Sequence, residues 1–307
     1  MKNLAFTRSN IEFKGFFAGI DTCPLSLIAQ IRDNCVGLTE LKKDYPFFQN
    51  RGIVDVLLLV PDEVAKKYPD VYEVKRIIHK ISQTLESNYN TFLFKKVQNG
   101  VPLAQAHKEG ILEFLNLTHK TTPFDLKKII SSNPEESHDN AYSVEEALSL
   151  FPKNKRVDLN SVILKENETS KAFPEDNSIL LNLEDNVLFQ MGEAVHEYAH
   201  LVDKEKEDVR TSNIDFLKTR ILSSNKIKMK DFLKGQDFKK THKDAEDTLI
   251  YPTTLLDPYA GLVYGSIEEN SPSEVLSVGL QALVVNPTSF YLRDPNYFSF
   301  VKEFLSV

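Results

Sequence analysis

Cysteine is scarce in this sequence, which has only Cys23 and Cys35 among its 307 residues. Two isolated thiols argue against a disulfide-stabilised fold and are typical of proteins kept in a reducing compartment. The sequence also has no run of about 18 apolar residues, the length that a membrane-spanning helix needs. We therefore expect a protein without a membrane span.

Positive charge is in short supply, because 37 lysines and arginines stand against 44 aspartates and glutamates, for a formal net charge of −7. Proteins that coat nucleic acid are normally basic, so we expect no nucleic-acid partner. The first residues, MKNLAFTRSNIEFKGFF, contain charged residues at Arg8, Glu12 and Lys14 and lack the apolar segment of a Sec signal peptide. We expect a cytoplasmic protein, or one exported by a route independent of a signal peptide.

The residues that are present suit a globular chain, with 41% hydrophobic and 26% charged residues. The length suits one large domain or two ordinary ones. A polar stretch that contains Pro134, residues 131–143, is the best candidate for a boundary. We therefore divide the chain into residues 1–139, a mainly helical region of unknown role, and residues 140–307.

Apolar spacing predicts three elements before this boundary. The compact β-branched run over 52–61 predicts a buried strand. Apolar residues three and four apart predict a helix over most of 62–89. Another helical pattern covers 101–120, with Gly110 as a candidate break.

A different pattern begins after the boundary. Ser143 and Glu146 form a capping box, which predicts the start of a short helix over 143–151. Residues 156–167 and 177–183 are rich in apolar residues and predict strands. In the second of these, alternation predicts one cleanly apolar face.

The stretch MGEAVHEYAHLVD, residues 191–203, follows the second strand. Asp185 is a suitable N-cap, so we expect a helix from there to about Val202. Residues four apart lie on one face of a helix, and therefore His196 and His200 can reach one Zn²⁺ at the usual Zn–N distance of about 2.0–2.1 Å.

Glu197 follows the first histidine directly and points to one side of the pair. A carboxylate there is badly placed as a ligand, but it can take a proton from a metal-bound water as a general base. The H-E-x-x-H spacing therefore predicts a zinc hydrolase. An ordinary helix is the alternative, although burying two histidines and a glutamate without partners is costly.

The motif HEYAH after the strand SILLNL resembles the active-site helix of the zincin metallopeptidases. The resemblance implies an α+β domain over 140–307, with a small mixed sheet, an edge strand and the active-site helix, that hydrolyses a peptide bond within a protein. In zincins, the substrate commonly extends an edge strand. The resemblance therefore implies a substrate-binding edge at Ile179, Leu180, Leu181 and Asn182.

A zinc hydrolase needs three protein ligands and an open position. The stretch NSPSEVLSVGLQALVV, residues 270–285, resembles the second helix of the gluzincins and implies Glu274 as the third ligand. The same SPSE stretch is also a good capping box, in which Glu274 would only cap a helix. Asp203 lies near the face of the two histidines and is the alternative ligand, or a group that supports a ligand from behind.

A hydrogen-bond donor aimed at the substrate oxygen is worth about 2.7–4 kcal/mol in other hydrolases. Gluzincins often supply it from a tyrosine or histidine near the third ligand, which implies Tyr264 or Tyr259 here. The wider pattern most resembles the lethal-factor-like peptidases and the metallopeptidase-type modules of some phage head-morphogenesis proteins. The lysine-rich segment 204–244 predicts an exposed helical insertion, or a contact for an acidic partner.

The sequence thus predicts a zinc metallopeptidase that acts on a protein segment, in a host cell if the chain is a toxin or effector. Two alternatives stay open. One is a zincin-shaped structural or interaction module without proteolytic activity, as in phage assembly. The other is an interaction protein in which HEYAH is accidental. The presence of Glu197 favours the enzyme, because a structural zinc site needs no general base.

Overall fold

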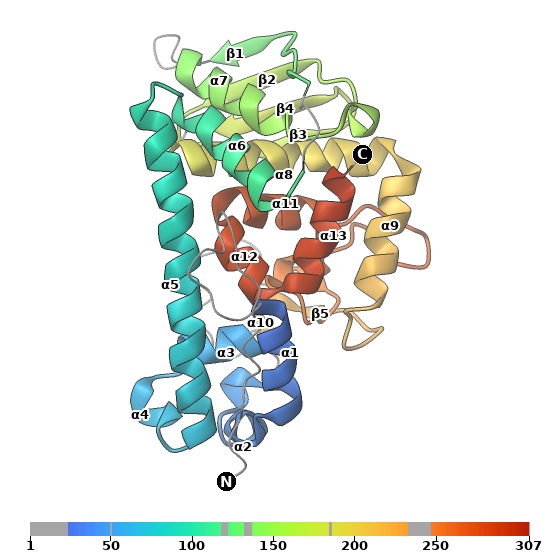
Figure 1. Cartoon of the computed structure of the whole chain (residues 1–307). Coiled ribbons are helices and arrows are strands. Elements are labelled where there is room, and N and C mark those ends of the chain that lie inside the picture. Colours follow the sequence, from blue (N-terminus) through green and yellow to red (C-terminus); the bar gives the residue numbers. More distant parts are fainter. Residues whose placement is uncertain are drawn as a thin grey trace.

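The structure is a computed structural model that describes residues 24–49, 51–117, 122–131, 137–183, 186–232 and 247–306. It combines many helices with a small mixed sheet, so the predicted α+β class is confirmed. The sheet lies at one end of the molecule, and helix α8 (Val187–Glu205) passes beneath it (Figure 1). No helix in the described ranges has the length and apolar content to cross a membrane.

The N-terminal part is helical, and its longest helix, α5, runs along one side of the molecule (Figure 1). Its elements are α1 (Pro24–Asn34), α2 (Val36–Asp44), the 3₁₀ helix η2 (Pro46–Phe48), α3 (Ile53–Leu59), α4 (Asp62–Ala65), α5 (Pro69–Gln98) and α6 (Leu103–Phe114). The helical pattern over 62–89 is therefore confirmed, with a short interruption before α5. Gly110 lies inside α6 and does not break it.

The strand that we predicted over 52–61 is wrong, because this run forms α3. Val54, Val56 and Leu57 are all buried in the helix, against a core that α5 shares. A short, continuous apolar run carries no periodicity that separates a strand from a helix.

The sheet has the strand order β1-β2-β4-β3. Its strands are β1 (Ile129–Ser131), β2 (Ser161–Lys165), β3 (Lys171–Phe173) and β4 (Ser178–Asn182). Strands β1, β2 and β4 are parallel, and β3 is antiparallel to β4. The strands predicted within 156–167 and 177–183 are therefore confirmed over shorter spans.

The predicted substrate edge is wrong, because β4 pairs with β2 on one side and with β3 on the other. Strand β3 forms this edge of the sheet instead. Ile179, Leu180 and Leu181 are all buried, so both faces of β4 are covered, and Asn182 is partly buried. Alternation of apolar residues reports which face of a strand is covered, and it carries no information about which strands flank it.

The predicted start of a helix at Ser143 is also wrong. Helix α7 (Ser137–Leu148) begins earlier, and Ser143 lies inside it, with its Oγ donating to the Asp139 carbonyl oxygen at 2.8 Å. A serine within a helix can bond backward in this way instead of capping. A 3₁₀ helix, η3 (Lys153–Lys155), follows before the sheet continues.

Helix α8 confirms the helix predicted for the HEYAH stretch. Asn186 is its N-cap, since its Oδ1 accepts from the Leu188 and Phe189 backbone N–H groups at 2.9 and 3.3 Å. Cys23 and Asp185 lie outside the described residues. Within the lysine-rich segment 204–244, residues 207–218 form helix α9 (Glu207–Lys218), so this part is helical as predicted. Residues 233–244 of the segment lie outside the described residues. The contact of this segment with an acidic partner stays a prediction.

The C-terminal helices complete the core beneath α8 (Figure 1). The remaining elements are β5 (Ile227–Lys228), α10 (Met229–Phe232), β6 (Leu249–Ile250), the 3₁₀ helix η5 (Pro258–Gly261), α11 (Val275–Val285), α12 (Pro287–Arg293) and α13 (Pro295–Leu305). Helix α11 packs closely along α8. At Gly192 a side-chain Cβ would lie only 2.7 Å from Val285 Cγ2.

Residues on both sides of the expected boundary share one buried apolar cluster. Strand β1 pairs with β2 across it, and His107 Nε2 donates to the Val284 carbonyl oxygen at 2.6 Å, which joins α6 to α11. The division of the chain between residues 139 and 140 stays a prediction. These contacts make the N-terminal helices part of the frame around α8 and α11.

Candidate metal centre

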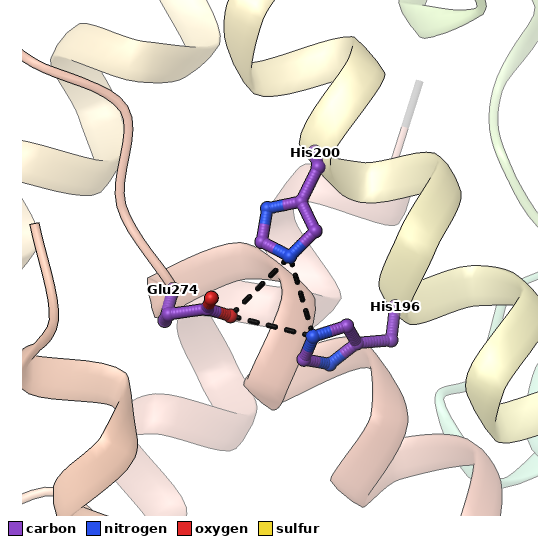
Figure 2. A group of neighbouring side chains, drawn as sticks. All are labelled: His196, His200 and Glu274. Carbon is purple, nitrogen blue, oxygen red and sulfur yellow. Dashed lines mark hydrogen bonds and ion pairs between the residues drawn. The ribbon is translucent and has the colours of Figure 1, made fainter. Parts of the chain in front are cut away.

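His196 and His200 are one turn apart on α8, and their imidazoles point into the space between α8 and the start of α11 (Figure 2). Their Nε2 atoms are 3.3 Å apart, and each side chain keeps 14% of its surface exposed. Burial lowers the pKa of His196 to about 4, against the raising effect of the Glu274 charge. A neutral imidazole is the form that binds a metal ion.

Glu274 completes this group from the residue directly before α11. Its Oε2 lies 3.4 Å from the Nε2 of each histidine, and the residue is 1% exposed. Figure 2 shows the carboxylate facing both imidazoles. The three residues thus offer two nitrogens and one oxygen within 4.8 Å of one another, and they could hold a metal ion.

The spacing of these three atoms tests whether they fit such an ion. Four ligands placed tetrahedrally at about 2.0–2.1 Å from an ion are about 3.3–3.4 Å from one another. The three observed separations are 3.3, 3.4 and 3.4 Å. The donor atoms therefore form one face of a tetrahedron of the size that a small divalent ion requires.

The capping-box interpretation of Glu274 is wrong. Helix α11 begins only at Val275, and the Glu274 side chain makes no capping hydrogen bond. Ser271, the expected cap, instead accepts a hydrogen bond from the Ser266 backbone N–H at 3.1 Å. The Glu274 backbone N–H donates to the Leu262 carbonyl oxygen at 3.0 Å, so tertiary pairing holds this residue out of the helix.

Two hydroxyl groups orient the Glu274 carboxylate. Ser277 Oγ donates to Oε2 at 2.6 Å, and the Tyr264 hydroxyl donates to Oε1. Burial alone would raise the pKa of Glu274, but His200, His196 and these hydrogen bonds together lower it. The carboxylate is therefore held in its ionised form, which is the form that binds a metal ion.

Glu197 lies beside the three candidate ligands and is 8% exposed. Burial, followed by the charges of Glu274 and Glu193, raises the pKa of Glu197 to about 8, while a hydrogen bond from the Ala172 backbone opposes the shift. Ala172 belongs to the edge strand β3. A carboxylate whose pKa lies near neutrality can both accept and release a proton, which suits a general base.

Both candidate tyrosines lie at Glu274. The Tyr264 ring centroid is 6.1 Å from that of His200, and the side chain is 59% exposed although its hydroxyl bonds Glu274. The pKa of Tyr259 is raised by burial and then by the Glu274 charge, and its hydroxyl bonds with Tyr264 and Glu274. The structure thus brings together both tyrosines that the sequence offered, and both stay candidates for contact with substrate.

Asp203 does not belong to the ligand group among the residues that the structure describes. Its Oδ1 accepts from Asn213 Nδ2 at 2.6 Å, and its Oδ2 accepts from the Ser273 backbone N–H at 2.8 Å. No local signal in the sequence points to Asn213 or Ala172. Asn213 lies on another helix, and Ala172 contributes through its backbone, which any residue possesses.

Comparisons with protein-family models, with curated proteins and with solved structures found no match to this chain. They leave the resemblance to zincins untested, and it stays a prediction.

Proposed function

We propose that this chain is a zinc-dependent metallopeptidase that hydrolyses a peptide bond within a protein substrate. The observation that carries the proposal is the triangle of His196, His200 and Glu274 donor atoms with separations of 3.3, 3.4 and 3.4 Å. Two imidazoles and one carboxylate are a ligand set that zinc hydrolases use. The mixed sheet over α8 supports the zincin resemblance.

Zinc held by these three residues would polarise the substrate carbonyl and lower the pKa of a bound water. Glu197 takes the proton from the attacking water and delivers it to the leaving amine. Burial of Glu197 on α8 raises the pKa of its carboxylate, so that it can exchange a proton near neutral pH. A purely structural metal site would not need Glu197 as a general base.

The tyrosines act on the substrate oxygen. Tyr264 is exposed while its hydroxyl lies at Glu274, so the hydroxyl can turn from the carboxylate to a carbonyl oxygen that gains negative charge. Tyr259 lies close enough to bond the same carboxylate and is the second donor. Strand β3 is the edge beside Glu197, and an extended substrate segment lies along it in this proposal.

Metal analysis and proteolysis of matched variants test the proposal. We expect the wild type, purified without chelators, to carry about one zinc ion per chain. Glu197→Gln should keep the zinc and lose about 10²–10⁴-fold in hydrolysis of a proteome-derived peptide mixture read by mass spectrometry. Glu274→Ala should lose the zinc. Glu205→Gln, which changes an exposed acidic residue at the end of α8, is the control and should keep both.

Two results would contradict the proposal. A wild-type protein that binds no zinc would remove the metal site. Stoichiometric zinc with hydrolysis that is the same in the wild type and Glu197→Gln would favour the structural or interaction module instead.

A further inference from the structure

Asp203 is buried one turn beyond His200 on α8, with 1% of its surface exposed. Burying a carboxylate is costly unless hydrogen bonds replace its water. Each of its oxygens accepts one, from Asn213 Nδ2 at 2.6 Å and from the Ser273 backbone N–H at 2.8 Å. Arg210 Nη1 donates to the backbone carbonyl oxygens of Asp203 and Lys204 at 3.1 and 2.7 Å.

The second of these bonds leads directly to the metal centre, because Ser273 is the residue before Glu274. Ser273 also forms a bridge with Val263, and the Glu274 N–H donates to Leu262 O at 3.0 Å. The segment that carries the third ligand is therefore held on one side by residues 262–264 and on the other by Asp203. Asp203 belongs to the same rigid helix as both histidines.

The position of Glu274 depends on this segment because the residue precedes the first turn of α11 and makes no cap bond there. Ligand groups must be held within about 0.5 Å of a productive geometry. Its Oε2 is 3.4 Å from both histidine nitrogens, so a small shift of Ser273 would open the triangle.

We propose that Asp203 and Asn213 are positioning residues that fix Glu274 relative to His196 and His200. Asp203 fastens the ligand-bearing segment to the helix of the histidines, and Asn213 on α9 keeps the Asp203 carboxylate aimed at Ser273. This inference rests on the metal site of the proposed function and is independent of the peptidase chemistry. Helix α9 therefore contributes to metal binding indirectly, through Asn213.

A reciprocal exchange tests the proposal. In Asp203→Asn, an amide of the same shape faces two donors and can accept from only one of them. We expect zinc affinity, measured by competition with a chromophoric chelator, to fall about 10–100-fold, the usual loss when a group that orients a ligand is removed. Asn213→Ala leaves the charge of Asp203 in place and should lower the affinity less, in the same direction.

The double variant Asp203→Asn/Asn213→Asp restores both bonds and reverses the direction of the one between positions 203 and 213. The amide at position 203 can donate to the carboxylate at position 213, while its oxygen still accepts from the Ser273 N–H. We expect zinc affinity to return to within about threefold of the wild type. A merely structural role would predict recovery of stability without a matching change in affinity at any step.

The control is Asp294→Asn, which alters another buried carboxylate outside the ligand group. Asp294 pairs with Arg220 at 2.8 Å and caps α13 through the Tyr297 N–H. Urea unfolding of the metal-free proteins should show a loss of stability in Asp294→Asn, with wild-type zinc affinity.

The outcomes separate this inference from the proposed function. Wild-type zinc affinity in both Asp203→Asn and Asn213→Ala would overturn the inference alone. So would a double variant that is as stable as the wild type but keeps the affinity of Asp203→Asn. A wild-type protein that binds no zinc would overturn the proposed function and this inference together.

Discussion

Gly192 offers a direct test of whether the contact between α8 and α11 sets the metal site. It lies one turn before His196 and faces Gln281 and Val285 of α11. A Cβ there would lie 2.7 Å from Val285 Cγ2 and 3.5 Å from Gln281 Cγ. Gly192→Ala adds one methyl group at this contact.

Two effects of opposite sign compete in this variant. Alanine in place of glycine inside a helix gains about 1 kcal/mol. Overpacking costs about 1–3 kcal/mol, and a contact of 2.7 Å is roughly 1 Å shorter than the optimum for two carbons. Val285 is β-branched and has few rotamers, so α11 has to move away from α8. We expect a net loss of up to about 2 kcal/mol in the free energy of unfolding.

The same displacement should weaken metal binding, because Glu274 precedes α11 and both histidines lie on α8. Gly279→Ala is the matched control on the other side of α11, where a Cβ would lie 2.6 Å from Val301 Cγ2 of α13. Urea unfolding with a chelator present measures stability, and competition titration measures zinc affinity. We expect both variants to lose stability and Gly192→Ala alone to lose affinity.

A Gly192→Ala protein that is about 1 kcal/mol more stable than the wild type would show that helix propensity wins and that the contact is loose. Equal losses of zinc affinity in the two variants would refute the claim that the spacing of α8 and α11 sets the site.

Three further predictions concern single side chains around this frame. Burial lowers the pKa of His107 to about 4 from 6.5, so the unfolded chain binds a proton between these values that the native chain does not. The free energy of unfolding should therefore fall by about 3 kcal/mol as the pH drops from 7 towards 4, and an equal pH slope in His107→Gln by urea unfolding would contradict this. Tyr264→Phe, assayed at saturating zinc because it also loses a hydrogen bond to Glu274, should lose about 10²–10³-fold in hydrolysis. Unchanged turnover would assign the donor role to Tyr259. Ser277→Ala removes the 2.6 Å hydrogen bond to Glu274 and should weaken zinc binding about tenfold in competition titrations. Wild-type zinc affinity in that variant would show that the remaining contacts suffice to orient the carboxylate.

The sequence predicts the site residues that lie close together along one helix. His196, Glu197 and His200 lie within one stretch of helix, where spacing alone fixes which side chains share a face. The helix itself is confirmed, and the structure brings a carboxylate to the two imidazoles. Asn213 and the backbone of Ala172 reach the site from other elements, so no spacing rule could identify them.

The strands could likewise be predicted only where the signal is local in the sequence. Residues 178–182 form a strand as expected, but its place between β2 and β3 depends on pairing with segments that precede it in the chain. Whether a strand lies at an edge is a property of the whole sheet. The strand predicted over 52–61 is wrong for a related reason, because a short continuous apolar run lacks the periodicity that would distinguish α3 from a strand.

The stretch SPSE before Val275 is where local preference and tertiary structure oppose each other most directly. As a capping box, it would turn the Glu274 carboxylate back towards the first backbone N–H groups of its own helix. One carboxylate cannot do this and also face His196 and His200. The Ser273 N–H bonds Asp203 and the Glu274 N–H bonds Leu262 O, so both groups pair with other elements, and α11 begins three residues later than the capping box predicts. A strong local signal that the fold overrides is expected at a functional residue, because selection for the site has to outweigh the local preference. The failure of the capping box therefore supports Glu274 as the third ligand.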